Sequence, residues 1–71
     1  MVVKLLLTNR EYDIITRLNK PNEEISKELG LSVNTINVFV YRLLRKFNVQ
    51  NRTALIIKLL KHGYVDLNAF D

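Results

Sequence analysis

The residues best suited to a chemical task lie between positions 33 and 47, where their spacing places them on one face of a helix. At about 100° of rotation per residue, five side chains share the side opposite the apolar residues: Asn34, Asn37, Val38, Tyr41 and Arg45. An asparagine amide can pair with the edge of an adenine, and Val and Tyr can contact the methyl group of thymine. The pattern is typical of a surface that reads bases in a DNA groove. Alternatively, Val38 and Tyr41 contact another part of the same chain.

Basic residues border this face. They are Arg42, Arg45 and Lys46, which can reach phosphate oxygens or guanine. Thr35 lies on the same edge of the face as Arg42 and Lys46. The net charge of the chain is +4, and residues 29–65 contain six basic residues and no acidic one, whereas the charges before them cancel. This asymmetry indicates either a polyanionic partner or a solvated basic face.

Capping signals predict four helices, so the expected fold is all-α. The first helix begins after Thr8, which can form a capping box with Glu11. Its expected core stripe is Tyr12, Ile15 and Leu18. The expected ranges of the other helices are Pro21 to Leu29, Val33 to Phe47, and Asn51 or Arg52 to His62.

The second and third helices are joined by a tight turn. Gly30 suits a left-handed cap of one helix, and Ser32 suits the N-cap of the next. Helices joined so closely must cross at a steep angle, which is the geometry of a helix-turn-helix. The third helix then turns an apolar arc toward the core. The residues of this arc are Ile36, Val40, Leu43 and Phe47, flanked by Val33, Phe39 and Leu44.

The fourth helix carries more apolar surface than one core needs. Its apolar side chains span about 200°, roughly twice the stripe that a surface helix buries, and we place the surplus at Ile57 and Leu60. Such a patch often marks an interface, and a two-fold dimer would present two recognition helices to two half-sites. Alternatively, the arm Val2–Leu7 or the tail with Tyr64 and Phe70 covers the patch.

Composition limits the remaining classes of protein. The 71 residues suit one domain spanning residues 1–71, and 48% of them are hydrophobic, which is enough for a core. Because the chain has no cysteine, a single histidine (His62) and no glycine-rich phosphate loop, we expect no metal, no cofactor and no enzymatic activity. The apolar runs are too short to cross a bilayer and no signal peptide is present, so we expect a cytoplasmic location.

Four separate segments carry a resemblance to a known family. They are Leu7–Glu11 (LTNRE), Glu24–Ile36 (EISKELGLSVNTI), Arg45–Thr53 (RKFNVQNRT) and Gly63. In this order and spacing, over about residues 7–65, the chain resembles the DNA-binding domain of the LuxR/GerE family of bacterial transcription regulators. The resemblance implies a four-helix helix-turn-helix domain whose third helix reads DNA and whose fourth helix forms dimers.

The resemblance also assigns roles by position. It assigns base reading to one group of residues and contact with the DNA backbone to another: Asn37, Val38 and Tyr41 for the bases, and Ser32, Thr35 and Lys46 for the backbone. Asn19 and Asn48 stand where the family has glycine. Because asparagine tolerates the left-handed conformation, we expect both turns to survive.

These observations favour a sequence-specific transcription regulator that inserts residues 33–47 into the major groove of double-stranded DNA, as a homodimer. Because the sequence starts at Met1 and leaves no room for a sensing domain, we expect a free-standing regulator rather than a fragment. The main alternative is a protein-interaction module of the same shape that acts on RNA polymerase or on another regulator. A promoter-reading domain like region 4 of sigma factors is a further alternative.

Overall fold

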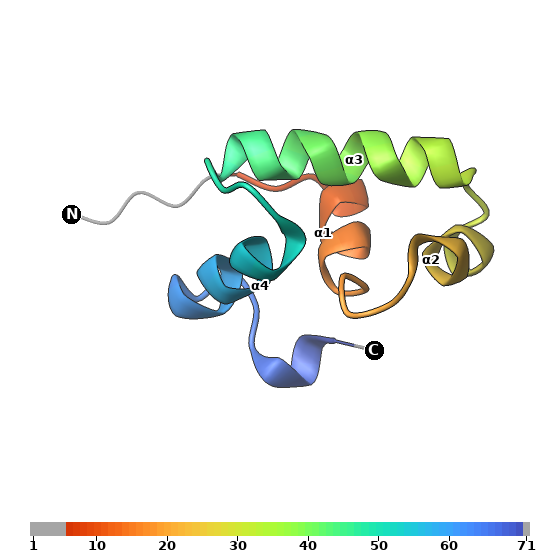
Figure 1. The fold of residues 1–71 in the computed structure, drawn as a ribbon. Coiled ribbons are helices and arrows are strands. Elements are labelled where there is room, and N and C mark those ends of the chain that lie inside the picture. The colour runs from red at the N-terminus through yellow and green to blue at the C-terminus, as the bar shows by residue number, and fades with distance from the viewer. Residues whose placement is uncertain (1–5, 71) are drawn as a thin grey trace.

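The computed structural model describes residues 6–70, and these residues form four α-helices and one short 3-10 helix. The elements are α1 (Asn9–Ile15), α2 (Asn22–Leu29), α3 (Val33–Lys46), α4 (Arg52–Lys61) and η1 (Leu67–Ala69). Figure 1 shows that α3 runs along one edge of the molecule, with α1, α2 and α4 all on the same side of it. The expected all-α fold is confirmed. One side of the longest helix is therefore left uncovered by the other described helices.

The predicted caps are present at three helix starts. Thr8 and Glu11 form both hydrogen bonds of the capping box, at 3.1 and 2.9 Å. The side chains of Ser32 and Asn51 each accept a hydrogen bond from the N–H three residues later, at 3.0 and 2.8 Å. At α2, however, Pro21 is the N-cap rather than the first helical residue. The helix starts are thus set by short-range hydrogen bonds that the sequence encodes locally.

The prediction that Tyr12 belongs to the core is wrong. Its side chain is 45% exposed, whereas Ile14 and Ile15 are fully buried. Helix α1 ends after Ile15, so Leu18 reaches the core from the following turn rather than from a continued helix. The two adjacent isoleucines therefore define the side of this short helix that faces the core, and Tyr12 does not lie on that side.

Positive φ angles occur at two of the three expected turns. Gly30 after α2 has φ +67°, and Asn48 after α3 has φ +56°. Asn19 does not have a positive φ angle, since Asn48 is the only non-glycine residue with positive φ among residues 6–70. After α1 the chain instead tightens through hydrogen bonds of the i to i+3 type, such as the one from the Lys20 N–H to the Arg17 carbonyl at 3.0 Å. This right-handed turn needs no left-handed residue.

The core lies beneath α3 and between the other three helices. Ile36, Leu43 and Phe47 of the predicted apolar arc are buried, and Val40, Phe39 and Leu44 are partly buried against them. Val33, in the first turn, is exposed and lies outside the core. The remaining buried apolar side chains come from the other helices and the tail: Ile14, Ile15, Leu18, Ile25, Leu55, Leu59 and Val65.

The tail returns to the core after α4. The ring of Tyr64 meets the ring of Phe47 edge-on, with centroids 5.0 Å apart, and Val65 is buried. Phe70 and Leu60 are partly buried against the same core, so the tail covers part of the surplus apolar surface of α4. Most of the arm Val2–Leu7, the other suggested cover, lies outside the described residues.

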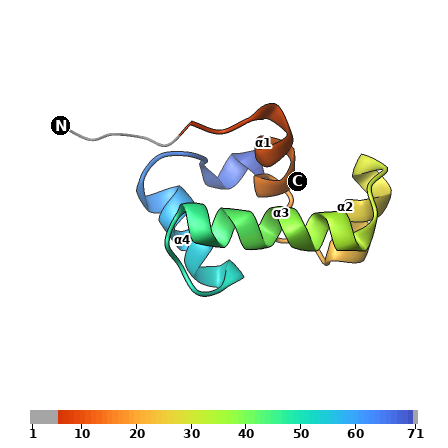
Figure 2. The same ribbon diagram turned by 90° about the horizontal axis from the view of Figure 1, so that it is seen from above.

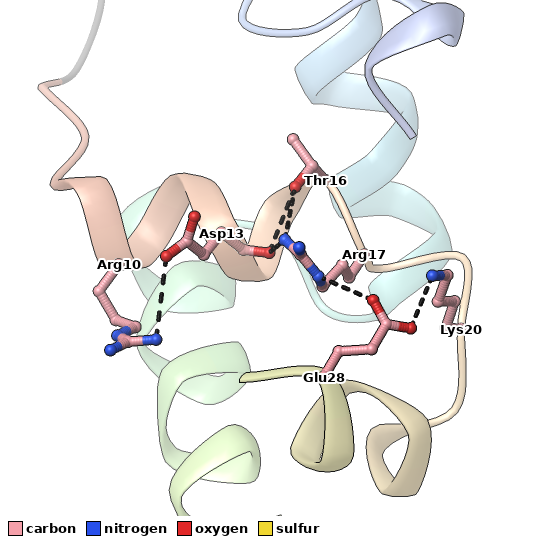
Figure 3. A network of polar contacts seen from close by, with 6 residues as sticks. All are labelled: Arg10, Asp13, Thr16, Arg17, Lys20 and Glu28. Atoms are coloured by element: carbon pink, nitrogen blue, oxygen red, sulfur yellow. Dashed lines mark hydrogen bonds and ion pairs between the residues drawn. The ribbon is translucent and has the colours of Figure 1, made fainter. Parts of the chain in front are cut away.

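Ion pairs fix α2 against the turn that precedes it. Figure 3 shows Glu28 of α2 between two cations: Glu28 Oε1 lies 3.1 Å from Arg17 Nε, and Oε2 lies 2.7 Å from Lys20 Nζ. The hydrogen bond from Lys20, together with the charge and hydrogen bond of Arg17, holds the pKa of Glu28 below its ordinary value of 4.5. The orientation of α2, and hence of the helix-turn-helix unit, is therefore tied to the end of α1.

Candidate nucleic-acid interface

The outer face of α3 is open to solvent. Figure 2 looks onto the side of α3 that is turned away from the other helices. Val38 and Tyr41 are 46% and 58% exposed, and Asn34, Asn37 and Arg45 are exposed as well. The alternative that Val38 and Tyr41 are buried against their own chain is therefore not what the structure shows. The five side chains predicted to share a face do share an accessible one.

Tyr41 and Arg45 form a pair on this face, one helical turn apart. Arg45 Nη1 donates a hydrogen bond to Tyr41 Oη at 3.1 Å, and the guanidinium carbon lies 5.8 Å from the centre of the tyrosine ring. The contact orients both side chains and leaves most donors of the guanidinium available. Arg42 is exposed on the neighbouring shoulder of the helix.

Ser32 and Thr35 lie together at the N-terminus of α3. Ser32 Oγ accepts the Thr35 N–H at 3.0 Å and lies 2.8 Å from Thr35 Oγ1. Ser32 is exposed and Thr35 is half-buried. The positive end of the helix dipole is at this position, and the hydroxyl groups and backbone N–H groups are donors of the kind that contact phosphate.

Lys46, at the other end of α3, is already engaged within the chain. Its Nζ lies 3.1 Å from Glu11 Oε1 and also donates to the Leu6 carbonyl oxygen. Burial by itself would raise the pKa of Glu11, but the hydrogen bonds from the Thr8 N–H and from Lys46 outweigh it and hold the pKa below 4.5. Lys46 is thus part of an intramolecular contact between α1 and α3, which its position in the sequence did not indicate.

Two residues outside the predicted face are connected to it. Arg52, the first residue of α4, donates from Nε to the Leu18 carbonyl at 2.9 Å, from Nη2 to the Lys20 carbonyl at 2.9 Å, and from Nη1 to Asn22 Oδ1 at 2.7 Å. Asn22 Nδ2 in turn donates to Asn37 Oδ1 at 2.5 Å.

The sequence offered one signal for Arg52. A cation in the first turn of a helix is unfavourable to the helix dipole, so a specific partner was to be expected there. The desolvation of this side chain lowers the pKa of Arg52, which nevertheless stays charged at neutral pH.

The two residues proposed for a dimer differ in their exposure. Ile57 is 57% exposed on α4, whereas Leu60 is partly buried and lines a shallow cleft between α1 and the tail, together with Tyr12, Tyr64 and Leu67. Of the predicted surplus, Ile57 alone remains a mainly exposed apolar side chain.

Comparison with known proteins identifies the class of this arrangement. The sequence model described as "Bacterial regulatory proteins, luxR family" matches residues 5–59. The chain belongs to the luxR family. The match includes the helix-turn-helix unit formed by α2 and α3 and nearly all of α4. The luxR family consists of transcription regulators with a DNA-binding domain, and it is not a family of enzymes.

Characterised luxR-family regulators are similar over most of the chain. The spore germination protein GerE of Bacillus subtilis is 32% identical over 66 residues, which cover 90% of this chain and 89% of GerE. The CsgBAC operon transcriptional regulatory protein of Escherichia coli is 40% identical over 53 residues, covering 72% of this chain and 24% of that protein. The nitrate/nitrite response regulator protein NarP of Escherichia coli is 38% identical over 58 residues, covering 79% and 27% respectively. The chain thus spans about a quarter of the length of the last two relatives.

Other kinds of site were sought in the same residues. Within residues 6–70 no group of three or more His, Asp or Glu side chains is placed to hold a metal ion. None of the described helices is long and apolar enough to span a membrane.

Proposed function

We propose that this chain is a sequence-specific DNA-binding transcription regulator that inserts residues 33–47 into the major groove of double-stranded DNA. The observation that carries the proposal is the outer face of α3, where amide, apolar and basic side chains are exposed and no acidic residue occurs between Val33 and Lys46. Exposure of Val38 and Tyr41 to water is unfavourable, and contact with thymine methyl groups would bury both. Membership of a DNA-binding regulator family supports the same role.

The dimensions and chemistry of α3 fit the groove. A helix with its side chains is about 10–12 Å in diameter, and the major groove is about 12 Å wide. We assign base contacts to Asn34, Asn37, Val38 and Tyr41, and phosphate or guanine contacts to Ser32, Thr35, Arg42, Arg45 and Lys46. For Lys46 this requires that the ammonium group exchange its contact with Glu11 for a phosphate oxygen.

We further propose that two copies of the chain bind DNA together. Ile57 is an exposed apolar side chain on α4, and Leu60 lies one helical turn farther along. A two-fold contact through these residues would cover Ile57 and present two α3 helices to half-sites about 34–36 Å apart. The regulator would act as one domain in the cytoplasm, without a cofactor or a catalytic residue. RNA polymerase is the further partner expected of a regulator bound beside a promoter.

Selection of bound sequences from random duplex DNA tests this function. We expect an enriched half-site, and an affinity for it that falls steeply with rising salt because each neutralised phosphate releases counterions. Replacing Asn37 by alanine should weaken binding to the selected site by about 1–3 kcal/mol and relax the base preference at one position. The substitution Asn68→Ala, in the exposed η1 segment on the opposite side of the molecule from α3 (Figure 1), is the matched control and should change neither. Failure to enrich any sequence would instead favour a protein-interaction module.

A further inference from the structure

We propose that Arg52 and Asn22 determine which hydrogen-bonding group Asn37 presents to DNA, so that Asn37 offers its N–H donors and not its carbonyl oxygen. The inference rests on the proposed function, because it concerns the base that this residue would read. Arg52 and Asn22 act here as positioning residues: neither lies on the outer face of α3, and both act through Asn37.

Arg52, Asn22 and Asn37 form a series in which each side chain donates a hydrogen bond to the next. The orientation of each amide therefore follows from the side chain that donates to it. An arginine has five N–H donors and no acceptor, so the Asn22 atom that lies 2.7 Å from Arg52 Nη1 must be the oxygen, Oδ1. Asn22 Nδ2 then points toward Asn37 and can only donate. The Asn37 atom that receives this hydrogen bond must therefore be its own oxygen, Oδ1. In consequence the Asn37 Nδ2 group is the part of this amide that is turned away from Asn22.

The start of this series is fixed by backbone atoms. Arg52 also donates to the carbonyl oxygens of Leu18 and Lys20, both at 2.9 Å, and peptide carbonyls cannot exchange oxygen for nitrogen as an amide side chain can. A flip of the Asn22 amide would place its Nδ2 donors against the guanidinium donors. The three residues come from the starts of α4 and α2 and from the exposed face of α3, so the hydrogen bonds run from a partly buried arginine to the proposed DNA surface.

The orientation changes the base that Asn37 is expected to prefer. The bidentate asparagine–adenine pair needs both an outward donor and an outward acceptor, but here the oxygen already accepts from Asn22 and is directed toward α2. An outward Nδ2 group instead suits bases whose major-groove edge offers acceptors alone, which are guanine with N7 and O6 and thymine with O4. Adenine also has an acceptor at N7, but its neighbouring amino group, like the amino group of cytosine, needs an acceptor that Asn37 does not present. We therefore assign guanine or thymine to the position that Asn37 reads.

Substitution of Asn22 by aspartate should reverse the direction of the hydrogen bond between positions 22 and 37, and so tests the inference. A carboxylate at position 22 still accepts from Arg52, and its second oxygen accepts from Asn37 Nδ2, which turns the oxygen of Asn37 outward. Position 22 is the first residue of α2, where a negative charge is favourable, so the variant should fold. In selections from random duplex DNA we expect the preference at one position to change to adenine or cytosine, with a change of about tenfold in relative affinity. Asn68→Asp carries the same change of charge in η1 and should keep the wild-type preference. Asn22→Ala should lose the preference without reversing it.

A measurement without DNA separates this inference from the proposed function. In the 15N-labelled free protein, the side-chain amide protons of Asn22 should show nuclear Overhauser contacts with Asn37. In Asn22→Asp the amide protons of Asn37 itself should shift downfield and exchange more slowly, because they now donate to a carboxylate. Unchanged Asn37 amide protons in that variant would overturn the inference, whether or not DNA is bound. If the wild-type chain selects a defined site and Asn22→Asp selects the same base at every position, the inference is likewise overturned.

Discussion

Truncation of Arg52 to alanine should be one of the most destabilising changes of a charged residue in this chain. The guanidinium group joins the start of α4 to the turn after α1 and to the start of α2, through two backbone carbonyl oxygens and Asn22 Oδ1. The alanine variant keeps the fold of α4 but leaves these three acceptors without their donor. The perturbation therefore tests whether the contacts of one half-buried side chain hold three segments together.

The size of the effect can be worked from the three hydrogen bonds. A hydrogen bond to a charged group contributes about 1.5–3 kcal/mol, but acceptors near the surface recover part of this by binding water. Removal of a cation from the first turn of a helix also returns about 0.5 kcal/mol. The expected net loss in free energy of unfolding is about 2–4 kcal/mol, which in a domain of this size lowers the midpoint of thermal unfolding by roughly 10–25 °C. Because total stabilities are near 0.05–0.15 kcal/mol per residue, the variant should be only marginally folded.

Urea unfolding followed by circular dichroism at 222 nm measures the loss. Arg42→Ala removes the same charge from an exposed position of α3 and should change the stability by no more than about 0.5 kcal/mol. Arg52→Lys keeps the charge but not the planar array of donors, so its stability should lie between those of the wild type and Arg52→Ala. If Arg52→Ala is as stable as Arg42→Ala, the guanidinium contacts do not contribute to stability and the reasoning is refuted.

Four other variants test separate features. Tyr41→Ala should weaken binding to the selected duplex by about 1–3 kcal/mol and binding to random duplex by less, as measured by fluorescence anisotropy; equal losses would show that Tyr41 does not read bases. Ile57→Glu should give monomers in sedimentation, whereas Leu67→Glu, at a similarly exposed apolar position, should not; an unchanged mass for both would place the interface elsewhere. Gly30→Ala should lose about 1–2 kcal/mol to the left-handed conformation, since an added Cβ meets no atom within 4 Å, and Gly30→Asn should lose less in the same urea titration. Glu11→Gln should cost up to about 1 kcal/mol at pH 7; because the pKa of Glu11 is lowered when folded, this difference should shrink as the pH falls from 4.5 through the lowered pKa, and a difference that does not shrink in acid would show that its charge is not responsible.

Features that depend on neighbouring residues could be predicted from the sequence. Each cap pairs a side chain with a backbone group three residues away, as at Thr8, Ser32 and Asn51. The left-handed residues after α2 and α3 follow from the glycine and asparagine at those positions. The two faces of α3 follow from its period alone, because a helix of this length has enough turns to define an apolar side. The expected boundaries of α2, α3 and α4 were accordingly within one or two residues.

Features that depend on how the helices cross could not be predicted in this way. The ion pair of Lys46 with Glu11 spans 35 residues, and the contact of Arg52 with Asn22 spans 30. Nothing within a few residues of these side chains specifies their partners, because the partners are set by the packing angles of α1, α2 and α4. The prediction for Tyr12 is wrong for a different reason: it places Tyr12, Ile15 and Leu18 on one helical stripe, although α1 ends at Ile15 and Leu18 belongs to the following turn. A seven-residue helix is too short for its period to decide which side is buried.

The distribution of basic residues shows how a count of charges can mislead. Of the six between residues 29 and 65, four donate within the chain: Lys46 to Glu11, Arg52 to Asn22 and two carbonyls, Lys58 to the Phe47 carbonyl at 2.7 Å, and Arg45 to Tyr41. Only three of the six are exposed, and these are Arg42, Arg45 and Lys61. Fewer cations are thus available to phosphates than the sequence suggests, so the neutral side chains of α3 must supply a larger share of any discrimination between sites. Discrimination by neutral groups depends on which donor or acceptor each one presents, and for Asn37 that choice is made by residues that do not touch DNA.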